Sequence, residues 1–158
     1  MQNQAEETLL AADFTPDEKY LTFFIDEQLY GISVEQVIEI IGIQPITRMP
    51  EMPEEVEGII NLRGSIVPLL NIRIKFNKQP APFDDKTCII VIEDGQARLG
   101  LIVDRVADVV SIEDHSLVTP PDYLLREQNP SIKGIVKLGD MLTQILDCSV
   151  LFAIDEIQ

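Results

Sequence analysis

Arg63 stands between two apolar runs in residues 58–70, which read GIINLRGSIVPLL. Its guanidinium offers five N–H donors in a rigid fork, a geometry that suits a carboxylate on the same chain or on a partner. Glu39 is a candidate acceptor, because it lies in the apolar run VIEII, where an unpaired carboxylate would be costly to bury. These residue types favour an ion pair between Arg63 and Glu39. The alternative is an exposed arginine beside an exposed glutamate.

The remaining reactive residue types do not form a catalytic pattern. The single histidine, His115, lies in the loop-like run IEDHSLV, with no cysteine or second histidine at metal-ligand spacing. The run GIINLRG lacks the lysine of a phosphate-binding loop, and no serine stands in a nucleophile elbow. Cys88 and Cys148 lie in apolar runs that suit reduced core thiols. We therefore expect no enzymatic activity, no metal and no cofactor.

Composition and charge limit the kinds of partner. The chain has 158 residues, of which 46% are hydrophobic and 25% charged, as expected for a soluble globular protein. No apolar run approaches the roughly 20 residues that span a bilayer, and the N-terminus is acidic, so we expect a cytoplasmic protein without membrane insertion. A net charge of −15 argues against nucleic acid. Residues 58–83 carry four positive charges and no acid, which most simply form a solvated face.

The pattern of apolar residues and turns predicts many short strands. Residues 1–18 hold five acids and no sustained apolar period, which is typical of a mobile arm. Ordered strands should begin near Tyr20, and residues 33–41 favour one helical turn that runs into a strand. Hairpin turns are expected at Arg63 and Gly64 and near Asp94, and a short helix over residues 71–76.

The chain also repeats itself. Residues 31–41 match residues 100–110 at an offset of 69, and residues 58–76 match residues 134–152 at an offset of 76. A unit of about 70 residues with many short strands predicts two pseudo-symmetric β-barrel lobes. Where the first copy has Arg63 and Gly64 at the hairpin turn, the second has Gly139 and Asp140. The turn itself therefore does not require Arg63.

Four runs carry a resemblance to a known family: FFIDEQLYGISVEQVIEII, GIINLRGSIVPLLNIRIKF, IIVIEDGQARLGLIVDRVADVVSI and GIVKLGDMLTQIL. Over about residues 20–152 the chain resembles the CheW-type coupling proteins of bacterial chemotaxis. The resemblance implies two SH3-like, five-stranded barrels and an adaptor that joins the regulatory domain of the histidine kinase CheA to the cytoplasmic tips of chemoreceptors. It also implies a kinase-binding face at Val34 and Val37, and a receptor-binding region made by Glu39, Gly58, Asn61, Arg63 and Val106, in which Glu39 and Arg63 pair.

These observations predict a mainly β protein with a few short helices, built as a mobile arm over residues 1–18, a CheW-like domain over 19–153 and a tail over 154–158. The first lobe would span about residues 20–86 and the second about 87–152, with exchange of strands between the lobes left open. Two other functions stay open: a related adaptor in a different pathway, such as pilus motility, and a β-barrel that binds a small molecule or nucleic acid.

Overall fold

The structure is a computed structural model that describes residues 18–111, 117–118 and 129–153. Within these ranges the chain is mainly β, with only three short helices. The acidic arm over residues 1–17, His115 and the C-terminal tail lie outside the described residues. Glu18, expected in the arm, accepts hydrogen bonds from the hydroxyls of Tyr20 (3.0 Å) and Ser33 (2.7 Å), so it belongs to the folded domain.

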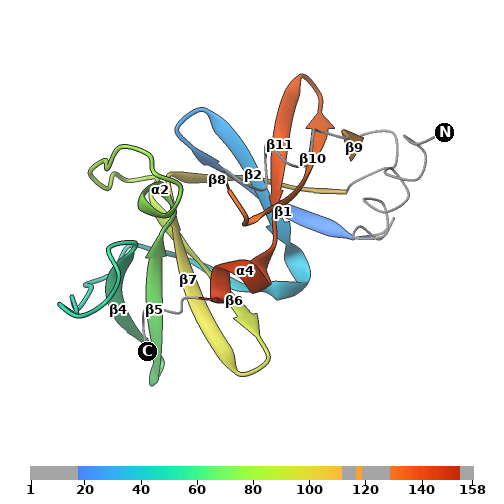
Figure 1. The fold of residues 1–158 in the computed structure, drawn as a ribbon. Coiled ribbons are helices and arrows are strands. Elements are labelled where there is room, and N and C mark those ends of the chain that lie inside the picture. Colours follow the sequence, from blue (N-terminus) through green and yellow to red (C-terminus); the bar gives the residue numbers. More distant parts are fainter. Residues whose placement is uncertain (1–17, 112–116, 119–128, 154–158) are drawn as a thin grey trace.

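The strands form two mixed sheets, which we call the first and the second barrel (Figure 1). The first barrel has the order β3-β6-β7-β5-β4, made by Val37–Gly42, Cys88–Asp94, Ala97–Val103, Ser65–Asn71 and Val56–Leu62. The second has the order β8-β1-β2-β11-β10, made by Arg105–Ser111, Lys19–Ile25, Gln28–Ser33, Met141–Leu146 and Ile132–Leu138. The short strand β9 (Leu117–Val118) adds to the edge of β10. The prediction of two five-stranded, SH3-like lobes is confirmed, and β9 is an addition to it.

The barrels exchange their first hairpins. Hairpin β1–β2 comes from the first repeat but lies in the second barrel, where β2 pairs in parallel with β11. Hairpin β6–β7 comes from the second repeat but lies in the first barrel, where β7 pairs in parallel with β5. The predicted boundary near residues 86 and 87 is therefore wrong as a division between sheets. The strand exchange that the sequence left open is present.

One hydrophobic core crosses from barrel to barrel. We call it the shared core. Its buried residues come from strands of both sheets and from the short helices that follow β5 and β11. They are Leu21, Phe23, Ile25, Tyr30, Ile32, Val56, Leu70, Ile72, Ile90, Ile92, Leu99, Leu101, Val103, Ile132, Leu146, Cys148 and Leu151. Burial of apolar surface is the main favourable term in folding. Because neither barrel can complete this core alone, we expect the two to unfold together.

Short helices follow equivalent strands in the two repeats. The 3-10 turn η1 (Val34–Gln36) begins after Ser33, whose hydroxyl accepts from the Glu35 amide, and it leads directly into β3. The helices α2 (Ile72–Lys75) and α4 (Cys148–Phe152) begin after Asn71 and Asp147, whose side chains accept from helix amides. Both cap residues also donate a 2.7 Å backbone hydrogen bond, to Glu55 and Ser131 respectively, which lie 76 residues apart. The predicted helical turn and the predicted helix after Asn71 are confirmed.

Candidate functional site

Strand β3 presents its residues alternately to the barrel and to solvent. Val37, Glu39 and Ile41 are half-buried, whereas Ile38 and Ile40 are exposed. A β-bulge between Val37 and Glu39 interrupts the pairing of β3 with β6. The Glu39 side chain retains 24% exposure, so its carboxylate stays accessible at the barrel surface.

Arg63 lies at the turn between β4 and β5, as predicted. Arg63 and Gly64 both have positive φ, at 50° and 89°. This conformation suits the right-handed twist of a two-residue hairpin but is unfavourable for arginine. The Asn61 side-chain oxygen accepts from the Gly64 amide at 2.8 Å and so fixes the turn. Asn61 therefore helps to position Arg63. The Asn61 side chain is itself exposed.

Gly58 allows the first barrel to close beside this turn. Thr47, in the segment after β3, exchanges two backbone hydrogen bonds of 2.9 Å with Ile59 of β4. Gly58 has φ of 154°, and a Cβ at this position would lie 2.3 Å from the Thr47 carbonyl oxygen. Real Cβ atoms do not approach that closely, so only glycine permits the contact. This closure brings the β3 edge of the sheet back to β4.

The closed barrel places the two charged side chains together. Nη2 of Arg63 donates to Oε1 of Glu39, so the contact expected from the sequence is present. The Arg63 side chain is 70% exposed, which makes this a surface ion pair. Such pairs add little to stability because water screens them. The guanidinium is instead well placed to contact a partner.

The other predicted site residues lie partly in the shared core. Val106 is half-buried on β8 of the second barrel, and its backbone contacts the Cys88 thiol of β6 in the first. Val34 and Val37 are also half-buried and pack against the shared core. Val37 and Glu39 share strand β3. Val37 of the predicted kinase-binding face and Glu39 of the predicted receptor-binding region thus lie two residues apart on one strand. Neither Val34 nor Val37 is fully exposed.

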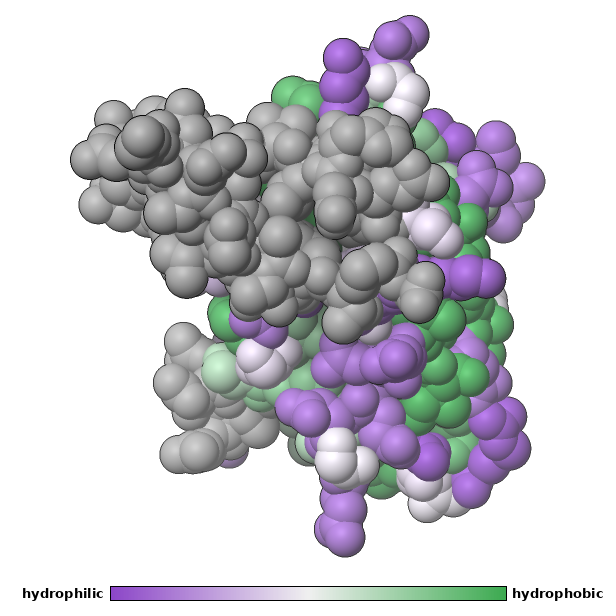
Figure 2. Space-filling view, turned by 90° about the vertical axis from the view of Figure 1, so that its right-hand side faces the viewer, coloured by the Kyte–Doolittle hydropathy of each residue, from purple (hydrophilic) through white to green (hydrophobic). Residues whose placement is uncertain are grey.

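Sequence analysis did not identify the exposed apolar side chains on β3 and β5, the strands next to the two charged residues in the chain. Ile38 and Ile40 are 38% and 45% exposed, and Ile66, directly after the Arg63 turn, is 59% exposed. Hydrophobic surface between hydrophilic residues is also present on the other side of the molecule, which faces the viewer in Figure 2. The exposure of Ile38 and Ile40 could not be predicted, because the run VIEII is almost uniformly apolar and shows no alternation between buried and exposed positions.

The basic stretch over residues 58–83 is largely neutralised. Arg63 pairs with Glu39, and Arg73 pairs with Asp26 and Asp104. Lys75 lies 4.0 Å from Glu55. Lys78 donates to the Gln28 side-chain oxygen instead of an acid. The expectation of a solvated face is wrong for Arg73, whose side chain is only 15% exposed.

The described residues offer little reactive chemistry. Burial raises the pKa of the Cys148 thiol to about 12 and also raises the pKa of Cys88, which leaves both thiols protonated and poorly nucleophilic near neutral pH. The described ranges hold no group of three or more metal-ligating side chains. They also contain no helix of the length and apolarity that a membrane span requires.

The chain is similar in sequence and in fold to known proteins. The model of the CheW-like domain matches residues 19–156. The chain is 32% identical to "Chemotaxis protein CheW" of Klebsiella aerogenes, over 90% of this chain and 86% of that protein. It is 33% identical to "Chemotaxis protein CheW" of Treponema pallidum, over 90% of this chain and 87% of that protein. The crystal structure of the scaffolding protein TtCheW from Thermoanaerobacter tengcongensis superposes with a TM-score of 0.78 at 33% identity, covering 89% of this chain and 90% of that one. The chain therefore belongs to the family of CheW-like domain proteins.

Proposed function

We propose that this protein is a non-enzymatic chemotaxis adaptor in the cytoplasm that couples the cytoplasmic tips of chemoreceptors to the histidine kinase CheA. The observation that carries the proposal is the Glu39–Arg63 pair, displayed at the tip of a CheW-like barrel. Arg63 holds an unfavourable backbone conformation that the equivalent turn of the second repeat achieves with glycine. Strain kept at an exposed residue points to a role in recognition.

The mechanism is bridging. Binding of both partners to one small protein raises their effective concentration, and it lets the state of the receptor bias the conformation of the kinase. A standard interface buries roughly 800 Å² per partner, and the accessible surface of the chain totals 9377 Å², which leaves room for two partners at once. The large negative charge makes nucleic acid an unsuitable partner.

We assign the receptor-binding region to the tip of the first barrel, at Glu39, Gly58, Asn61 and Arg63, with Val106 at the seam between the barrels. The pair supplies both a donor fork and a carboxylate, and Ile40 and Ile66 supply exposed apolar surface nearby in the chain. Aromatic, aliphatic and arginine side chains at the centre of an interface commonly contribute most of its binding energy. The kinase-binding face is assigned to η1 and the start of β3, at Val34 and Val37.

Substitution of Arg63 tests the receptor side. Arg63→Glu should weaken binding to an isolated receptor-tip fragment at least tenfold, because it reverses the charge beside Glu39. Its free energy of unfolding should change by no more than about 1 kcal/mol, since the pair is exposed. Calorimetry with the receptor fragment and urea unfolding measure the two effects. Arg63→Asn is the matched control, because asparagine tolerates positive φ but cannot form the donor fork. Receptor affinity equal to wild type in both variants would contradict the assignment.

Substitution on η1 tests the kinase side without disturbing the core. Glu35 is exposed between Val34 and Gln36, and its carboxylate has no role in capping the turn. Glu35→Arg should therefore lower affinity for the isolated kinase regulatory domain by about fivefold or more while leaving receptor affinity near wild type. Arg63→Glu should show the converse pattern. If each variant loses both partners in equal proportion, a single surface serves both and the assignment of two faces fails.

A further inference from the structure

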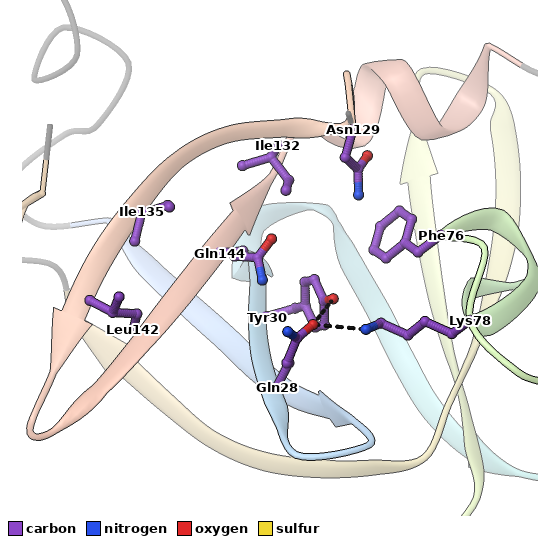
Figure 3. A pocket seen from close by; sticks show the side chains of 9 residues that line it. All are labelled: Gln28, Tyr30, Phe76, Lys78, Asn129, Ile132, Ile135, Leu142 and Gln144. Carbon is purple, nitrogen blue, oxygen red and sulfur yellow. Dashed lines mark hydrogen bonds between the residues drawn. The ribbon is translucent and has the colours of Figure 1, made fainter. Parts of the chain in front are cut away.

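A cavity opens in the second barrel, away from the Glu39–Arg63 pair. Its volume is about 470 Å³, within the range of roughly 300–1,000 Å³ that is usual for small-ligand sites. Three segments supply its walls: strand β2, the residues that follow α2, and hairpin β10–β11 with the residues just before it. The described lining residues are Gln28, Tyr30, Phe76, Lys78, Asn129, Ile132, Ile135, Leu142 and Gln144, and Figure 3 shows these side chains around one hollow.

Three polar side chains of this cavity, those of Gln28, Tyr30 and Lys78, are linked by hydrogen bonds. The Tyr30 hydroxyl and the Lys78 ammonium both donate to the side-chain oxygen of Gln28, at 2.9 and 2.8 Å (Figure 3). The pKa of the Tyr30 phenol is raised to about 12, chiefly by burial. The phenol therefore stays neutral and the network is pre-formed. Phe76 packs beside the Tyr30 ring at 5.4 Å between centroids.

The internal duplication provides a comparison for these polar residues. Gln28 and Tyr30 correspond to Ala97 and Leu99 of the first barrel, at the offset of 69, and Gln144 corresponds to Pro68 at the offset of 76. The apolar walls do not change in character: Ile132, Ile135 and Leu142 correspond to Val56, Ile59 and Ile66. The same β-framework thus forms with apolar residues at these three positions. The fold alone does not account for the amides and the phenol of the second barrel.

The charge and the donors of the cavity indicate the chemistry of a ligand. Lys78 is the only ionised group among the described lining residues. Because the Gln28 oxygen already accepts two hydrogen bonds, its amide N–H groups remain as donors, as do those of Asn129, whose oxygen accepts from the Ser131 amide. The nearby carboxylate of Asp26 is paired with Arg73 and is thereby offset. Donors beside a lysine favour an anion, and the opposite wall favours an apolar group.

We propose that this cavity binds a carboxylate attached to an aromatic or branched aliphatic group, with the carboxylate at Lys78, Gln28 and Asn129 and the apolar group against Phe76, Ile132 and Ile135. The ligand is either a free organic acid or an acidic side chain next to an apolar residue in a peptide. The described lining residues of the cavity include none of the residues assigned to the proposed receptor-binding region.

Two probes of shared chemistry test this proposal in the full chain by NMR. The first is 3-phenylpropanoate as a free acid, and the second is the blocked dipeptide acetyl-Glu-Phe-amide. We expect saturable shifts of the Gln28 and Asn129 side-chain amides and of the Ile132 and Ile135 methyl groups, with a Kd on the order of 1 mM for a ligand of this size. The neutral amide 3-phenylpropanamide should bind about three- to tenfold more weakly. Tighter binding of the free acid identifies a small-molecule site, and tighter binding of the dipeptide identifies a peptide site.

Matched variants locate the effect. Lys78→Gln should weaken both acidic probes about three- to tenfold, whereas Lys19→Gln, at the opposite end of β1 from the β1–β2 turn, should leave them unchanged. The double variant Gln28→Ala, Tyr30→Leu installs the residues of the first barrel and should abolish site-specific shifts while the protein still melts cooperatively. The proposal is overturned if neither probe shifts these signals at about 10 mM, or if the neutral amide binds as well as the acid. Unchanged affinity in Lys78→Gln overturns it as well.

Discussion

Gly58→Ala should lower the free energy of unfolding by about 2–4 kcal/mol, an unusually large effect for the addition of one methyl group. The new Cβ would lie 2.3 Å from the Thr47 carbonyl oxygen and 2.8 Å from Cγ2 of Ile46, and alanine rarely adopts a φ of 154°. Either β4 or the Thr47 segment must move. Urea unfolding followed by circular dichroism measures the loss, and hydrogen exchange should become faster at the amides of Thr47 and Ile59.

Gly42→Ala is the control for this substitution. Gly42 is the last residue of β3 in the same barrel, but it is exposed and a Cβ there would have no neighbour within 4 Å. Its stability should stay within about 1 kcal/mol of wild type or rise slightly, because alanine reduces the entropy of the unfolded chain. If the two variants unfold at the same urea concentration, Gly58 does not hold the barrel closed. Weak receptor binding by Gly58→Ala would then need a direct contact as its explanation.

The fold was predictable from the sequence to the level of repeats and hairpins. The turn at Arg63 and Gly64 and the short helix after Asn71 carry local signals, because positive φ and helix capping depend on a few neighbouring residues. The duplication predicted two similar lobes, since matching residues must form matching strands. These features need no knowledge of which strand lies beside which.

The exchange of hairpins could not be read from the sequence. Hairpins β1–β2 and β6–β7 have equivalent patterns, so either could complete either barrel with similar local contacts. The choice depends on the shared core and on the connections between sheets, which are properties of the whole chain. Pro68 illustrates the limit. A proline has no N–H group and is generally found on an edge strand or at a bulge, yet β5 is an interior strand. The pairing of β5 with β7 begins only at Leu69, directly after the proline.

The candidate site was predictable from the sequence only in part. The Glu39–Arg63 contact followed from the cost of burying an unpaired acid and from resemblance to a family, and the structure brings the two side chains together. The conditions that make this possible did not follow: the Gly58–Thr47 closure, the hydrogen bond of Asn61 to the turn, and the exposure of Ile66. The Gly58–Thr47 closure and the exposure of Ile66 depend on how separate segments pack, which residue patterns do not encode. The Asn61 hydrogen bond is local, since it spans only three residues, but it forms only because Arg63 and Gly64 take positive φ.

The sequence analysis expected Arg73 to lie on a solvated face, whereas the structure shows that it connects the two barrels. It lies on α2, directly after β5 of the first barrel. Its guanidinium donates to both oxygens of Asp104, at 2.9 and 2.6 Å, and also to Asp26 at the β1–β2 turn of the second barrel. Asp104 stands between β7 and β8, where the chain crosses from one barrel to the other, and it accepts from the Asp26 amide at 2.7 Å. These carboxylates raise the pKa of Arg73 above its usual value, with the Asp104 hydrogen bonds as the main cause.

Arg73→Ala should therefore cost about 2–4 kcal/mol of unfolding free energy, because it leaves Asp26 and Asp104 facing each other without a cation. Arg73→Lys should recover less than half of the loss, since an ammonium cannot make the two parallel hydrogen bonds to Asp104. Lys75→Ala is the control on the same helix: its ion pair with Glu55 is long, at 4.0 Å, and should contribute less than about 1 kcal/mol.

A double-mutant cycle separates this contact from a general effect on α2. If Arg73 acts through Asp104, then Arg73→Ala should cost much less in an Asp104→Asn background than in wild type. Additive losses would contradict the contact as the source of stability.

The functional consequence follows from the position of Arg73 between the barrels. A variant that binds each partner alone but transmits receptor state to the kinase poorly would show that signalling needs a fixed angle between the barrels. Normal transmission in stably folded Arg73→Lys would show that the exchanged hairpins and the shared core already fix it.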